Sequence, residues 1–157
     1  MSAEPQLVLE WGERGLAACP GRAVAVASAH GFETGAAAAL LREARRDPDR
    51  LVLASGLEEA ADTARRLLAE QLRLGRRLPI AIVAAGGYWP DGAPRWNVGD
   101  LLAAGALVDA LCEAGIDFHS PACAVASAAY VELRGAVRHL VSAERTGRVG
   151  AVENGPV

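Results

Sequence analysis

The chain has 157 residues, of which 52% are apolar, a size typical of one domain with a single hydrophobic core. No stretch approaches the roughly 18 uninterrupted apolar residues of a membrane span, so the sequence predicts no membrane partner. The net charge of −3 is spread over interspersed acids and arginines, which excludes the clustered cations that nucleic-acid binding requires. Lysine is absent, which excludes a lysine Schiff base and a P-loop lysine.

The N-terminal segment predicts a cytoplasmic protein, and the cysteines predict no disulfide framework. An acid and a proline follow the start closely, and Glu10 interrupts the apolar residues, so the basic-then-apolar layout of a secretion signal is missing. The 3 cysteines, Cys19, Cys112 and Cys123, are odd in number and have no CxxC spacing. They therefore favour buried free thiols over a disulfide framework or a zinc site.

Short β-branched runs alternate with longer helical stretches. In chain order we predict an edge strand over 6–11, a turn over 12–15, strands over 23–27, 51–54 and 80–84, and helices over 33–46, 57–74, 98–113 and 122–141, with Ser120 as a cap before Pro121. Strands without polar alternation are typical of a parallel sheet buried on both faces. The prediction is an α/β fold of three-layer α/β/α type, with a small, mainly parallel sheet of three to four or more strands. Residues 1–145 form the single domain, and 146–157 a loosely held tail.

The loop after the strand over 23–27 carries the first candidate chemistry. Histidine side chains can act as general acids or bases near neutral pH, and His30 is predicted as a catalytic acid or base, with Glu33 orienting it or capping the next helix. Ser28 and Gly31 flank it as candidate substrate contacts at the strand end. The alternative is structural: Ser28 and Glu33 serve the helix start, and His30 is a solvated loop residue.

For the loop after the strand over 51–54, the favoured interpretation is the start of a helix. Ser55 would be the cap and Glu58 its partner three residues on, which forms a capping box. Ser55, Gly56 and Glu59 are also candidate substrate contacts because they occupy the carboxyl end of a parallel strand. For Glu59, dipole compensation at the first turn of the helix is the competing interpretation.

The loop after the strand over 80–84 combines flexible glycines with aromatic and charged residues. The candidate substrate contacts here are Gly86, Gly87, Tyr88, Trp89, Asp91 and Arg95, with Trp96 close by. An equally weighted alternative is a hydrophobic lid over the edge of the sheet. Asp100, at the start of the helix that follows, is predicted as a third catalytic residue, supplying charge or orienting His30.

Residues 82–95 and 98–107 resemble the late part of the 2-phosphosulfolactate phosphatase family. Weaker similarities lie at Glu10-Trp11-Gly12, at residues 28–31 and at Ser120-Pro121. The resemblance implies a magnesium-dependent phosphatase that forms dimers. The chain departs from the family pattern where an early threonine-rich segment has no counterpart, and where His30, Gly87 and Gly99 replace an asparagine and two acids.

Three hypotheses follow from these residues. The leading one is a repurposed small-molecule enzyme with acid–base chemistry, in which no cofactor is certain and the metal ligands are unknown. The second is a surviving phosphatase that binds magnesium through Asp91, Asp100 and the acids of the second loop. The third is a non-catalytic binding or assembly protein, which the alanine-rich helix faces favour. We expect a small-molecule substrate and a homodimer.

Overall fold

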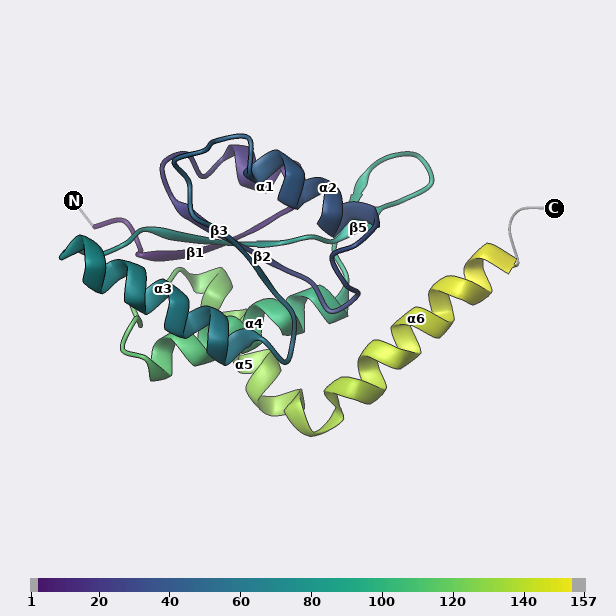
Figure 1. Ribbon diagram of the computed structural model, residues 1–157. Helices are drawn as coiled ribbons and strands as arrows, with labels where there is room; N and C mark the ends of the chain where they lie inside the picture. Colours follow the sequence, from purple (N-terminus) through teal and green to yellow (C-terminus); the bar gives the residue numbers. More distant parts are fainter. Residues whose placement is uncertain (1–2, 154–157) are drawn as a thin grey trace.

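The computed structural model describes residues 3–153, with side chains through residue 145. The elements are β1 (Leu7–Trp11), α1 (Gly12–Ala17), β2 (Ala23–Ala27), α2 (Gly35–Ala44), β3 (Val52–Ser55), α3 (Ala60–Leu74), β4 (Ile80–Ala84), β5 (Gly87–Tyr88), β6 (Pro94–Arg95), α4 (Val98–Glu113), α5 (Pro121–Leu133), the 3₁₀ turn η1 (Arg134–Ala136) and α6 (Val137–Glu153). They form a three-layer α/β/α arrangement around one sheet (Figure 1). The predicted fold class is confirmed.

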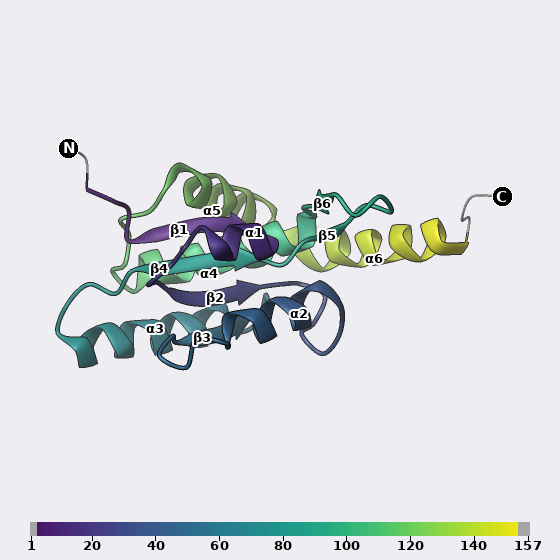
Figure 2. The ribbon, with the colours of Figure 1, turned by 90° about the horizontal axis from the view of Figure 1, so that it is seen from above.

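The central sheet is parallel, with the strand order β1-β4-β2-β3. Every residue of β2 and of β4, the two inner strands, is buried, as their uninterrupted apolar runs predicted. The predicted strand over 6–11 is confirmed as the edge strand β1 beside β4. Figure 2 shows the strands in this order from above.

Helices cover both faces of the sheet. On one face, Val24 and Val26 of β2 pack against leucines of two helices. These are Leu16 of α1 and Leu40 and Leu41 of α2. Residues of α3, α4 and α5 pack on the other face around Ile80 and Ile82. The neighbouring strands β1 and β4 are followed by helices on opposite faces of the sheet, α1 on one face and α4 on the other. The connections that leave the carboxyl ends of these two strands therefore diverge. Such a point is where ligands bind in open parallel sheets.

Two predicted helix starts were wrong because the loops before them extend further than the helical pattern indicates. Helix α2 begins at Gly35 after a left-handed Gly31, and α3 begins at Ala60, with Glu59 as its N-cap. The capping box of Ser55 and Glu58 is therefore wrong. The predicted turn over 12–15 is the short helix α1, and the third loop contains the hairpin β5–β6.

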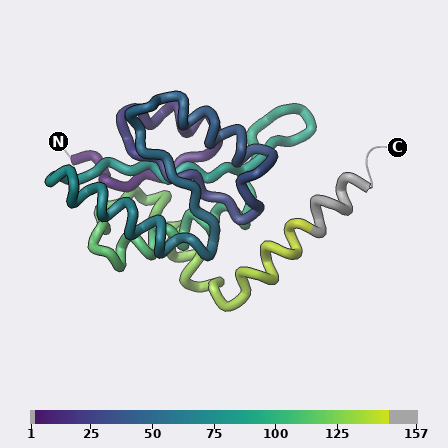
Figure 3. Tube along the Cα trace, viewed as in Figure 1, coloured from purple at the N-terminus to yellow at the C-terminus, as the bar shows by residue number. Residues whose placement is uncertain are grey.

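The predicted helix over 122–141 is divided by η1 into α5 and α6. Helix α6 continues to Glu153, through the part predicted as a loose tail, while residues 154–157 lie outside the described residues. Val137 and Val141 anchor its first turns against Leu102 of α4. Figure 3 shows the first turns of α6 running from η1 past the loop that follows β2, to which Arg145 bonds. Among the described residues, no helix is both long and apolar enough to cross a membrane.

Candidate functional site

Asp100 connects three segments at the carboxyl edge of the sheet. Its Oδ1 accepts hydrogen bonds from Ser28 Oγ at 3.0 Å and from the Ala29 N–H at 2.9 Å. Its Oδ2 accepts from the Gly86 N–H at 2.8 Å and from Asn97 Nδ2 at 3.0 Å. The residue is 1% exposed, so this carboxylate holds the ends of β2 and β4 to the start of α4 away from solvent. Its bonds indicate a structural role.

Asn97 is a site residue that the sequence analysis missed. Its Oδ1 accepts from the Asp100 N–H at 2.8 Å as the N-cap of α4, while its Nδ2 supports the Asp100 carboxylate. The signal was present in the sequence, because an Asn directly before a predicted helix, with an acid three residues on, is a helix-start pattern.

His30 pairs with Glu144, not with Glu33 or Asp100. The distance from His30 Nε2 to Glu144 Oε1 is 2.5 Å, and both side chains are largely buried. Glu33 is exposed in the loop before α2, and the bonds of Asp100 go to other donors, so the structure does not support either residue as the partner of His30. No sequence signal could have identified Glu144, which is 114 residues away on a helix whose predicted end was residue 141.

The carboxylate of Glu144 also binds the start of α4. The Val98 N–H donates to its Oε2 at 2.8 Å and the Gly99 N–H to its Oε1 at 3.1 Å. Burial raises the pKa of Glu144, but the hydrogen bonds from His30, Gly99 and Val98, together with the charge of His30, lower it below its ordinary value overall. Glu144 is therefore a carboxylate at neutral pH, as the partner of a histidine must be.

Gly99 makes this approach possible. A Cβ on Gly99 would lie 2.8 Å from both Glu144 Oε1 and His30 Nε2, closer than side chains tolerate. The position is therefore one where the absence of a side chain creates space for the pair.

Arg145 completes the surroundings of the histidine. Its Nε donates to His30 Nδ1 at 3.3 Å and its Nη2 to the Ala29 carbonyl at 2.9 Å. Because a guanidinium only donates, Nδ1 is the acceptor nitrogen and Nε2 carries the proton toward Glu144. The basic nitrogen of the neutral ring thus faces the exposed Arg145.

A first cavity, which we call the loop hollow, has a volume of about 430 Å³. It lies between the loops after β2 and β3 and helix α6, and it is lined by Ser28, Ala29, Gly31, Phe32, Gly56, Leu57, Glu58, Glu59, Arg138, Val141, Ser142 and Arg145. This cavity thus brings four predicted substrate contacts together beside Arg145, which covers Nδ1 of His30. The four are Ser28, Gly31, Gly56 and Glu59. Ser55 lies below them, fully buried, with a hydroxyl that has no hydrogen-bond partner among the described residues.

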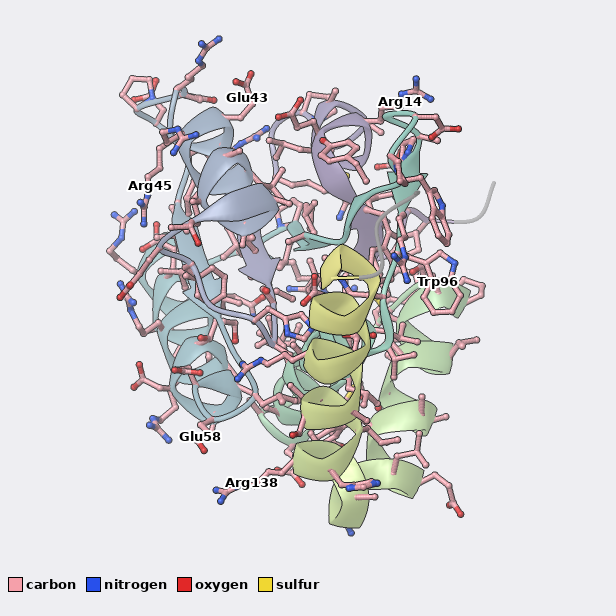
Figure 4. The ribbon with its side chains drawn as sticks, turned by 90° about the vertical axis from the view of Figure 1, so that its right-hand side faces the viewer. Arg14, Glu43, Arg45, Glu58, Trp96 and Arg138 are labelled. Carbon is pink, nitrogen blue, oxygen red and sulfur yellow. The ribbon has the colours of Figure 1, made fainter. Side chains whose placement is uncertain are left out.

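A second cavity, which we call the hairpin hollow, has a volume of about 370 Å³ and lies at the ends of β1 and β4. Its lining consists of Trp11, Gly12, Glu13, Arg14, Ala85, Gly86, Gly87, Tyr88, Gly92, Pro94, Arg95 and Trp96. The predicted contacts Gly86, Gly87, Tyr88 and Arg95 meet here. Figure 4 shows Arg14 and Trp96 on one side of α6, and Glu58 and Arg138 of the loop hollow away from them. The predicted single site is therefore divided between two cavities.

The remaining two candidates of the third loop belong to the hairpin itself. Trp89 stacks on the Arg95 guanidinium, whose carbon lies 4.1 Å from the ring centroid. Asp91 Oδ1 accepts from the Ala93 N–H at 2.9 Å at the exposed tip, so this carboxylate shapes the turn. Neither residue lines the hairpin hollow, although Trp89 and Glu144 both line a third depression of about 470 Å³ next to it.

The residues proposed to bind magnesium do not converge. Asp91 is at the hairpin tip, Asp100 is bonded to four donors, and Glu58 pairs with Arg138 at 3.3 Å. The described residues include no group of three or more His, Cys, Asp or Glu side chains placed to hold a metal ion. The side chains present therefore do not fit the magnesium site that the phosphatase resemblance implies.

Comparisons with known proteins do not identify the chain. No protein-family model matches it, and neither the curated proteins nor the solved structures contain a match. The resemblance to 2-phosphosulfolactate phosphatases stays a prediction from the sequence.

Proposed function

We propose that the chain is a small-molecule enzyme that transfers a proton through His30 at the loop hollow. The observation that carries this proposal is the His30–Glu144 pair, held at 2.5 Å, whose other ring nitrogen contacts Arg145, a residue of the lining of the loop hollow. A carboxylate behind one ring nitrogen fixes the tautomer and stabilises the imidazolium that forms when the other nitrogen takes a proton.

The pair fits a defined order of events. A substrate in the loop hollow displaces the Arg145 side chain from His30 Nδ1, and this nitrogen then accepts a proton from the substrate. Glu144 is the positioning residue, because its carboxylate contacts Nε2 of His30, whereas the proton from the substrate is accepted at Nδ1. General acid–base catalysis of this kind contributes roughly 10²–10⁴ in rate.

The test is a comparison of variants on a substrate found by screening small polar metabolites for turnover. We expect His30→Gln to lower kcat at least about 100-fold, and Glu144→Gln to lower it less while changing the pH profile of kcat/KM. The matched control is His139→Gln, because His139 is an exposed histidine on α6. Full turnover by His30→Gln would overturn the proposal.

A second candidate, a non-catalytic binding or assembly protein, is favoured by one observation. Glu144 and Arg145 bond to the start of α4 and to the loop after β2, so the same contacts fasten α6 to the body. On this reading the His30→Gln and Glu144→Gln variants lose stability together and no turnover is found. A homodimer through the outer face of α5, where Val125 is 65% exposed, would accompany it and is tested by sedimentation equilibrium.

A further inference from the structure

The hairpin hollow has the form and position of a small-molecule site in its own right. Its volume of about 370 Å³ falls within the range of roughly 300–1,000 Å³ typical of ligand pockets. It lies where the connections from β1 and β4 diverge to opposite faces of the sheet. Its lining shares no residue with that of the loop hollow.

Aromatic rings form its walls and stay in contact with solvent. Tyr88 is 55% exposed and Trp96 is 61% exposed, although burying such rings is strongly favourable. The rings of Trp11 and Trp96 form a tilted aromatic contact, with centroids 6.0 Å apart and planes inclined at 58°, and the largely exposed Trp96 ring offers a surface to a flat guest. Exposed apolar surface gathered in this way marks a binding site.

The walls are held rigidly. Trp89 and Ala93 pair through the backbone at 2.8 Å, and Gly87 and Tyr88 pair with Arg95 and Pro94 in the antiparallel ladder. Gly86 is left-handed at φ +62°, and a Cβ there would lie 2.7 Å from the Arg95 carbonyl oxygen. The exposure of the rings is therefore a property of a fixed hairpin, and a ligand would meet a preformed surface.

The charges of the lining select the sign of the ligand. The guanidinium groups of Arg14 and Arg95 form no ion pair or hydrogen bond with the described residues, while Glu13 is the acid in this lining. Stacking of Arg95 on Trp89 occupies the face of the guanidinium and leaves its in-plane N–H groups available. This edge matches a carboxylate, which can accept two parallel hydrogen bonds from it.

We infer that the hairpin hollow is a second ligand site, distinct from the loop hollow, for a flat organic anion such as an aromatic carboxylate. The ring of the ligand stacks against Trp11 and Trp96, and its carboxylate meets Arg95 and Arg14. A small inorganic anion would use the arginines without the rings, and a flat neutral molecule would use the rings without the arginines.

The experiment is calorimetric titration of the whole chain with 2-naphthoate, 2-naphthamide, cyclohexanecarboxylate and inorganic phosphate. We expect saturable binding of 2-naphthoate with a Kd of about 1 mM or lower, and at least tenfold weaker binding of the other three probes. Equal binding of the amide, of the non-planar anion or of phosphate would overturn the assignment, as would no binding of 2-naphthoate.

Variants separate this site from the rest of the molecule. Arg95→Gln and Trp96→Leu, both at exposed side chains, should each weaken 2-naphthoate binding at least tenfold. Arg134→Gln, at an exposed arginine of η1, is the matched control and should bind as the wild type does. His30→Gln should also bind normally, so a failed acid–base proposal leaves this one standing. Unchanged binding by Arg95→Gln, with a wild-type unfolding curve, would refute it.

Discussion

Replacement of Asp100 tests whether its carboxylate is structural. Asp100→Ala would leave Ser28 Oγ, the N–H groups of Ala29 and Gly86, and Asn97 Nδ2 without the acceptor that they now share. Each buried donor without a partner costs about 1–3 kcal/mol, and such costs do not add fully. We expect Asp100→Ala to lower the free energy of unfolding by about 3–5 kcal/mol.

Asp100→Asn refines the same prediction. An asparagine keeps one acceptor oxygen, but its NH₂ group would face either the donors at Oδ1 or those at Oδ2. The expected loss is about 2–3 kcal/mol, intermediate between wild type and alanine.

Urea unfolding followed by far-ultraviolet circular dichroism measures these differences, with the slope m checked for constancy. Asp91→Ala is the matched control, because Asp91 accepts a single backbone hydrogen bond at the exposed hairpin tip, and its loss should cost less than about 1 kcal/mol. If Asp100→Ala costs no more than Asp91→Ala, the structural role of Asp100 is refuted.

Two further predictions concern a helix contact and a titrating group. Gly105→Ala should lower the free energy of unfolding by about 3 kcal/mol or more, because its Cβ would lie 2.0 Å from the Ala126 carbonyl oxygen of α5. The control is Gly135→Ala in η1, where a Cβ meets open space and the free energy of unfolding should change by less than about 1 kcal/mol. Equal urea midpoints for the two variants would contradict this prediction. For Glu144, the lowered folded-state pKa means that its stabilisation is present above about pH 4.5 and is lost as the pH falls through the folded value. Glu144→Gln should therefore be less stable by about 1–3 kcal/mol at pH 7, with the gap closing as the pH falls below the folded-state pKa of Glu144, and a gap independent of pH would show the reasoning wrong.

The sheet could be predicted from the sequence because its signal is local. The five consecutive apolar residues of β2 are enough to indicate a strand that is buried on both faces of the sheet. The alternation of strands and helices along the chain then limits the possible topologies. The hairpin β5–β6 could not be predicted, because strands of two residues each have no periodicity to detect.

The candidate site was predictable only in part, since its residues come from distant parts of the chain. Strand-end position correctly placed Ser28, Gly56 and Gly86 near cavities, because parallel strands end at one edge. The partner of His30 and the partition into two cavities depend on where α6 returns after η1. In the sequence, Gly135 indicates that the helix can be interrupted at η1, but it does not indicate the direction in which α6 then runs.

His30 and Gly99 lie against each other in the structure. A side chain at residue 99 would displace either the imidazole or the Glu144 carboxylate, since its Cβ would lie 2.8 Å from each. An acid there would also place a second negative charge beside Glu144, which raises carboxylate pKa values and weakens the pair. The glycine is thus a condition for the His30–Glu144 contact, on which the proposed proton transfer depends.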